Sequence, residues 1–221
     1  MAQPTGFLST TVGQKALMAL SGLALVGFVI AHMLGNLQVF LGPEALNAYA
    51  RSLRAVPALL WAARAVLLLS VVAHVSTAIR LVQRAAAARP QGYRQAHHAA
   101  TTYAARTMKI SGPLLALFIA YHLAHLTFPG VAMGGYIHSP TDVYANVVAG
   151  FSIPWVAGIY VVAQVLLALH LYHGIWSMLQ SLGASHPRIV QPRRALAQGL
   201  ALLVLAGNLS IPIGVQLGVV R

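Results

Sequence analysis

The chain has 221 residues, of which 58% are hydrophobic and only 7% are charged. So few charged side chains cannot cover a soluble globule, whereas lipid requires no such cover, and the composition therefore predicts an integral membrane protein. The net charge of +12 does not indicate nucleic-acid binding, because the Lys and Arg residues lie between apolar segments and are not interleaved with aromatic residues. The absence of cysteine excludes disulfides, thiolate-bound haem and iron–sulfur clusters built from this chain.

Five apolar segments are each long enough to cross a bilayer as a helix, which takes about 20 residues. They are residues 16–41, 57–79, 108–128, 153–179 and 195–217. Between the first two segments, residues 44–56 predict an amphipathic helix in the membrane interface. Residues 128–152 predict an outer loop. Because the connections are short, residues 1–221 are expected to form a single domain, an all-α bundle of five transmembrane helices.

The distribution of Lys and Arg predicts how the helices are oriented. Most of these residues lie in segments 80–109 and 188–194, whereas residues 128–152 contain none. Since cytoplasmic loops carry the excess of positive charge, we expect the N-terminus in the cytoplasm and the C-terminus outside. Arg51 and Arg54, in the first outer loop, are the exceptions to this pattern.

Four histidines lie inside the apolar segments, where an ionisable side chain is costly and normally marks function. His32 and His122 lie past the middle of outward-running helices, and His74 and His170 lie past the middle of inward-running helices. We therefore expect an outer pair, His32 with His122, and an inner pair, His74 with His170. At 1.5 Å per residue, the two levels would lie roughly 12–16 Å apart along the membrane normal.

Two imidazoles at each level predict the axial ligands of two haems. A mononuclear zinc or iron site usually takes three or four side-chain ligands, often carboxylates, and the apolar segments contain no Asp or Glu. Haem supplies four equatorial nitrogens itself, so two imidazoles complete its coordination and leave electron transfer as its chemistry. The alternative is that each histidine only forms a hydrogen bond to a neighbouring helix.

An internal repeat supports this interpretation and links the first and third segments at an offset of 90 residues. The repeated residues are Met18, Ser21, Gly22, Leu25, Phe28 and His32, which recur as Met108, Ser111, Gly112, Leu115, Phe118 and His122. The repeat favours His122 over His125 as a ligand, but it does not decide between His170 and His173. The other histidines, His97, His98, His138 and His186, are predicted to be solvated.

Several motifs surround the candidate ligands: His-Met-Leu-Gly-Asn at 32–36, Gly-Pro-Glu-Ala-Leu-Asn at 42–47, Val-Val-Ala-His-Val around His74, Ile-Ala-Tyr-His ending at His122, and residues 170–177 ending Gly-Ile-Trp-Ser. Over nearly its whole length the chain resembles the cytochrome b membrane-anchor subunit of succinate dehydrogenase/fumarate reductase, of the five-helix, two-haem, single-subunit type. In that family the histidine four positions before the glycine is the ligand, which implies His170.

The resemblance implies two haem b groups and a location in the bacterial cytoplasmic membrane. It also implies a flavoprotein subunit and an iron–sulfur subunit as partners, with electrons passing between the iron–sulfur subunit and a membrane quinone, usually menaquinone, near the outer haem. Such an anchor does not itself oxidise succinate. Some relatives carry a glutamate two residues before the fourth ligand, where this chain has Ala168, and an acidic residue late in the first outer loop, where it has Arg51–Arg54. The quinone-site candidates are then Glu44, Asp142 and Tyr144.

The propionates of the inner haem would need cationic or hydrogen-bonding partners. We expect Arg106 in this role, with Lys15, Arg80 and Lys109 as further candidates, because all four lie at the cytoplasmic ends of histidine-bearing helices. The alternative is that these residues only set the topology. The basic segments 80–109 and 188–194 are the expected docking surface for the iron–sulfur subunit.

Two other functions fit part of the pattern. A proton-coupled transporter could use membrane histidines as a relay, but the chain lacks membrane carboxylates and interrupted helices. A haem b subunit of another respiratory dehydrogenase, such as a hydrogenase or formate dehydrogenase, is not excluded by composition.

Overall fold

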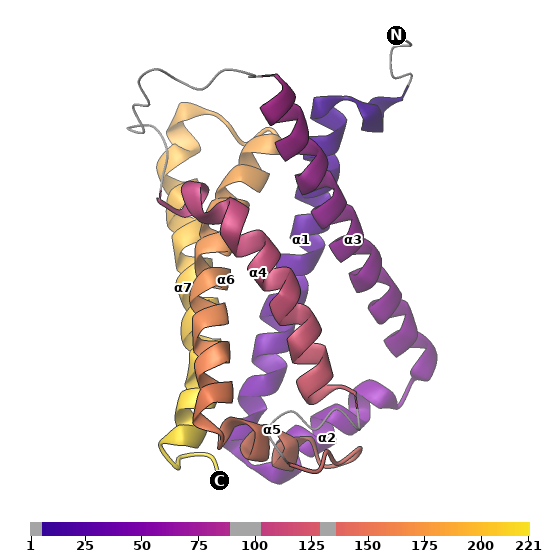
Figure 1. Cartoon of the computed structure of the whole chain (residues 1–221), viewed down its shortest axis with the longest axis vertical. Helices are drawn as coiled ribbons and strands as arrows, with labels where there is room; N and C mark the ends of the chain where they lie inside the picture. The colour runs from indigo at the N-terminus through magenta and orange to yellow at the C-terminus, as the bar shows by residue number, and fades with distance from the viewer. Residues whose placement is uncertain (1–5, 89–102, 129–135) are drawn as a thin grey trace.

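The computed structural model describes residues 6–88, 103–128 and 136–221, and these ranges fold into helices joined by short connections (Figure 1). Five helices are long and apolar enough to cross a membrane. They are α1 (Thr11–Asn36), α3 (Pro57–Ala87), α4 (Tyr103–Leu126), α6 (Pro154–Ser181) and α7 (Val190–Gln216). This confirms the predicted all-α architecture with five candidate spans.

Local sequence signals set several helix starts. The Thr10 side chain accepts a hydrogen bond of 3.0 Å from the N–H of Gly13 and caps α1. Pro57 and Pro154 occupy the first turns of α3 and α6, where their fixed φ suits a helix. α3 and α7 extend beyond the predicted apolar segments at their basic ends, because hydrophobicity marks only the part of a helix that faces lipid.

Five shorter helices complete the described chain. They are η1 (Phe7–Ser9), η2 (Leu37–Leu41), α2 (Pro43–Arg54), α5 (Val143–Phe151) and η4 (Pro187–Ile189). α2 is the predicted amphipathic helix, and Gly42 before it has a φ of 98°, which favours glycine. α5 lies inside residues 128–152, so the prediction of a loop there is wrong for this part. It was missed because a helix of nine residues leaves too short an apolar pattern.

The long helices are arranged around α1 and α6. α1 packs against both α3 and α6, and α6 packs against α4 and α7, with α7 on the outside of the bundle (Figure 1). We call the end where α1 begins the N-terminal face. The opposite end, covered by α2 and α5, is the C-terminal face. An interhelical hydrogen bond of 3.0 Å from Asn208 to Gln164 joins α7 to α6.

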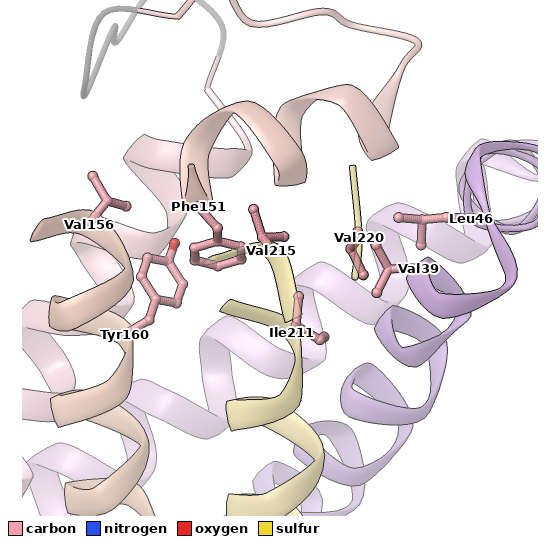
Figure 2. Close-up of a cluster of buried hydrophobic side chains, with 8 residues drawn as sticks. All are labelled: Val39, Leu46, Phe151, Val156, Tyr160, Ile211, Val215 and Val220. Atoms are coloured by element: carbon pink, nitrogen blue, oxygen red, sulfur yellow. The ribbon is translucent and has the colours of Figure 1, made fainter. Parts of the chain in front are cut away.

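Buried apolar side chains form two clusters. The cluster at the C-terminal face joins α2, α5, α6 and α7, and its members are Val39, Leu46, Phe151, Val156, Tyr160, Ile211, Val215 and Val220 (Figure 2). The second cluster lies between α1, α6 and α7, and its members are Met33, Leu171, Ile175, Ala197, Ala201 and Val204. Many large apolar side chains of α3, including Trp61, Leu68 and Leu69, are exposed, as expected for a surface that faces lipid.

Candidate functional site

The structure brings the four membrane histidines together as two pairs. The ring centroids of His32 on α1 and His122 on α4 lie 5.8 Å apart, and those of His74 on α3 and His170 on α6 lie 6.2 Å apart. Two imidazoles bound on opposite sides of one metal, at about 2 Å each, place their centroids roughly 6 Å apart. Each pair therefore has a spacing at which one metal could lie between the two rings.

The two pairs lie at different levels along α1. The His74 ring rests on Gly22, where a Cβ atom would lie 3.4 Å from the imidazole Cε1. His32 belongs to the same helix and follows Gly22 by ten residues, a rise of roughly 15 Å. A Cβ atom at Gly112, the repeat equivalent of Gly22, would have no described atom within 4 Å. Gly22 thus allows close approach of an imidazole, and Gly112 borders open space.

The His74 ring has a defined orientation. Its Nδ1 atom lies 3.3 Å from the carbonyl oxygen of Met18 and 3.5 Å from the hydroxyl of Ser21. Because a carbonyl only accepts hydrogen bonds, Nδ1 carries the hydrogen and Nε2 keeps the lone pair that a metal requires. His170 differs, since its Nδ1 is buried and has no hydrogen-bond partner among the described residues.

The outer pair has side-chain partners. The Nδ1 atom of His122 lies 3.1 Å from the Tyr160 hydroxyl. The amide nitrogen of Asn36 lies 3.0 Å from Nε2 of His32, so a metal at that nitrogen requires the half-buried Asn36 side chain to rotate. Phe28 stacks on the His32 ring at 5.2 Å.

The structure also distinguishes the paired histidines from their neighbours three residues later. His125 is 1% exposed, and its ring contacts Tyr121, Tyr136, Phe151 and Tyr160. His74 faces His170 and not His173. The rings that contact each other in pairs are therefore those of the four histidines that the sequence placed at paired depths.

A buried polar cluster near the outer pair was missed by the sequence analysis. We define the Tyr160 cluster as His122, His125, Tyr136 and Tyr160. The Tyr160 hydroxyl lies 2.9 Å from Nδ1 of His125, and the Tyr136 hydroxyl donates to the carbonyl of His125 at 2.8 Å. A signal existed in the sequence: Tyr160 precedes His170 by ten residues, which places it roughly 15 Å from the inner level and thus near the outer one.

The prediction that His138 is solvated is wrong. Its Nε2 atom lies 3.3 Å from the carbonyl of Leu126 and 3.4 Å from the amide of Asn146, and its Nδ1 is buried without a partner in the described ranges. The cause is α5, the unpredicted helix, which carries Asn146. His186 is exposed as expected, and His97 and His98 lie outside the described residues.

The candidate propionate partners are placed differently from one another. Lys15 lines a cavity of about 270 Å³ together with Met18, Ser177, Gln180 and Ser181, and Met18 is the residue that orients His74. Arg80 lines a separate cavity of about 630 Å³ near Gln14 and Arg84. Arg106 and Lys109 are exposed on α4. All four cations are exposed, and of the four only Lys15 lines a cavity that includes Met18.

The three quinone-site candidates all lie at the C-terminal face, and two of them have structural contacts. Asp142 caps α5 by accepting from the N–H of Ala145 at 2.9 Å and also accepts from Asn47 at 2.9 Å. These two hydrogen bonds lower the pKa of Asp142, so it stays ionised at neutral pH. Tyr144 donates to the carbonyl of Arg221 at 3.1 Å. Glu44 is exposed in the first turn of α2.

Within the described ranges, no group of three or more His, Cys, Asp or Glu side chains could hold a metal ion. No protein-family model, curated protein or solved structure matches this chain. What the site can do must therefore be inferred from its own residues.

Proposed function

We propose that this chain is the di-haem cytochrome b membrane anchor of a succinate:quinone oxidoreductase. The observation that carries the proposal is the pair of 5.8 Å and 6.2 Å histidine contacts, at two levels, on four different membrane-spanning helices. Imidazoles at this spacing, with no hydrogen bond between them, could supply the axial nitrogens of one haem in each pair. Each bound haem would accept and release one electron, and two haems at these levels would connect the two faces of the bundle.

The chain's own residues would hold the inner haem in an apolar, water-poor site. His74 and His170 would supply the axial nitrogens, with His74 oriented by the carbonyl of Met18. Lys15 and the amide of Gln180 line the adjacent cavity and would receive the propionates. A carboxylate at the membrane boundary needs such partners because its desolvation is costly.

The N-terminal face is the proposed docking surface for the iron–sulfur subunit. Its basic residues include Lys15, Arg80, Arg84, Arg106, Lys109, Arg188 and Arg194. The chain's two acidic residues, Glu44 and Asp142, both lie at the other face, so no acidic side chain of this chain can neutralise this surface. An acidic partner surface would do so, and electrons entering there would meet the inner level first. The positive-inside rule places this face in the cytoplasm.

Quinone, of the menaquinone class, would bind near the outer pair at the C-terminal face. An electron at that level has crossed most of the membrane, so its acceptor must lie beside it. Quinone reduction also consumes protons, and Glu44 is the candidate for delivering them because the carboxylate of Asp142 is already engaged as the cap of α5. Tyr144 is the remaining candidate at this face.

A haem b subunit of another respiratory dehydrogenase would use the same histidine pairs, and only the partner subunits separate it from the proposed function. A transporter is less well supported, because the described spans contain no Asp or Glu. The test is to purify the chain under mild conditions and record its optical spectrum and its co-purifying subunits. We expect two low-spin haem b groups per chain, with a flavoprotein and an iron–sulfur protein. A preparation without haem would overturn the cytochrome assignment, and different partners would overturn the enzyme assignment.

A further inference from the structure

The hydroxyl of Tyr160 contacts the same nitrogen, Nδ1, of two histidines. It lies 3.1 Å from His122 and 2.9 Å from His125. Tyr160 is 5% exposed and His125 is 1% exposed, so neither group can exchange this contact for water. His125 is not a member of either histidine pair, and the proposed electron path gives it no role.

The single hydrogen of the hydroxyl restricts the possible arrangements. If the Tyr160 hydroxyl donates to His122, the lone pair of Nδ1 accepts this hydrogen bond. The imidazole must then carry its own hydrogen on Nε2. Neither nitrogen could then bind a metal. If His122 instead donates from Nδ1 to the Tyr160 oxygen, its Nε2 is bare, and the Tyr160 hydroxyl can donate its own hydrogen bond to Nδ1 of His125. Only the second arrangement is compatible with a metal at His122.

The surrounding rings hold Tyr160 in this position. Phe151 and Phe118 contact it edge-on, with centroids 4.7 Å and 5.0 Å away, and Figure 2 shows its ring packed beside Phe151 in the cluster at the C-terminal face. Tyr136 fixes the adjacent backbone through its hydrogen bond to the His125 carbonyl. His125 Nε2 has no partner among the described residues in either arrangement, so it does not select between them.

We propose that Tyr160 and His125 are positioning residues that fix the tautomer of His122 and lower the midpoint potential of the outer haem. This inference rests on the proposed function. A ligand imidazole becomes more basic when the nitrogen that does not bind the metal donates its N–H hydrogen bond to an oxygen. The more basic ligand favours the ferric over the ferrous state. In the inner pair the nearest partner of His74 Nδ1 is the backbone carbonyl of Met18, which no substitution removes, and the Ser21 hydroxyl lies farther away at 3.5 Å.

The test is a redox titration of both haems in the intact complex carrying Tyr160→Phe. Phenylalanine keeps the ring contacts and removes only the hydroxyl. We expect the equilibrium ratio of ferrous to ferric outer haem to rise by up to tenfold, which raises its midpoint potential by up to ~59 mV for one electron. The midpoint potential of the inner haem should be unchanged. His32→Ala and His74→Ala, each lacking one haem, assign the two potentials. Tyr121→Phe is the matched control, since the buried Tyr121 hydroxyl has no described hydrogen-bond partner.

A second set of variants applies if Tyr160→Phe fails to assemble. His125→Asn keeps an acceptor near the position of Nδ1 and should retain the wild-type potential, whereas His125→Leu removes it and should raise the outer potential. Two intact haems with unchanged potentials in Tyr160→Phe, or in His125→Leu, would overturn this inference and leave the proposed function standing. A wild-type protein without haem would overturn the proposed function itself.

Discussion

The Nδ1 atom of His74 lies 3.3 Å from the carbonyl oxygen of Met18, so the backbone of α1 orients the side chain that α3 contributes to the inner pair. The same helix supplies Gly22, against which the ring rests, and Ser21, whose hydroxyl lies 3.5 Å from Nδ1. One turn of α1 therefore determines both the tautomer and the position of a candidate ligand on another helix.

Replacing Gly22 with valine should displace the His74 ring. A Cβ atom at this position only touches the ring at 3.4 Å, but the two γ-methyl groups of valine would overlap it. We expect loss of the inner haem with retention of the outer one, measured by haem content and optical spectrum. Gly27→Val is the matched control on the same helix, because a Cβ atom at Gly27 meets nothing within 4 Å. Equal haem content in the two variants would contradict the proposed packing.

Lys15→Gln should lower the midpoint potential of the inner haem and leave that of the outer haem unchanged. The physical reason is electrostatic: a cation beside the haem disfavours the ferric state, and Lys15 shares a cavity with Met18, the partner of His74. Arg106→Gln removes an exposed cation from α4 and serves as the control. A larger shift in Arg106→Gln than in Lys15→Gln would restore Arg106 as the main propionate partner.

Glu44→Gln should slow quinone reduction without affecting the other subunits. Succinate-driven quinone reduction is measured beside succinate-to-dye activity, which bypasses the membrane anchor. We expect the first to fall and the second to stay at the wild-type level, because Glu44 is the acid at the C-terminal face that is free of capping contacts. Unchanged quinone turnover would remove Glu44 from the proton path.

Asp142→Ala should destabilise the C-terminal face, since the loss of an N-cap costs about 1 kcal/mol. Asp142→Asn keeps a capping oxygen but not the charge, so at neutral pH its stability should lie between that of wild type and that of Asp142→Ala, with quinone turnover close to wild type. The hydrogen bonds from Ala145 and Asn47 lower the pKa of Asp142 in the folded protein. Its contribution to stability is therefore present above the unfolded-state pKa of about 4, and it is lost as the pH falls through the lower folded value.

Thermal unfolding in detergent between pH 6 and pH 3 checks this dependence. The stability difference between wild type and Asp142→Ala should narrow toward acid pH. A difference that is independent of pH would show that the charge of Asp142 has no role in capping α5.

The sequence predicted the spans and the histidine pairs because both follow from one-dimensional quantities. Apolar length predicts a span, and residue count along a helix predicts depth, which brings His32 to the level of His122. The rotation of each helix about its own axis, which determines the side chains that face the bundle interior, does not follow from such one-dimensional quantities. Lys15 and Arg106 both lie at the basic ends of their helices, but of the two only Lys15 lines the cavity that includes Met18. Such differences depend on how α1, α4 and α6 pack.

The Tyr160 cluster was partly predictable and partly not. The depth of Tyr160 follows from its distance to His170 along α6, but its contact with both His122 and His125 depends on the rotation of α4 relative to α6. His138 could not have been placed at all without α5. The helix that covers it is too short to leave a periodic pattern, and only the Asp142 cap marks its start.

The haem content of four single alanine variants tests the central claim most directly. His122→Ala and His170→Ala remove proposed ligands, whereas His125→Ala and His173→Ala remove the histidines three residues later. With two haem b groups in the wild type, measured by pyridine haemochrome per chain, we expect one in each of the first two variants and two in each of the last two. A variant of His122 or His170 that retains both haems would contradict the assignment of the histidine pairs as haem ligands.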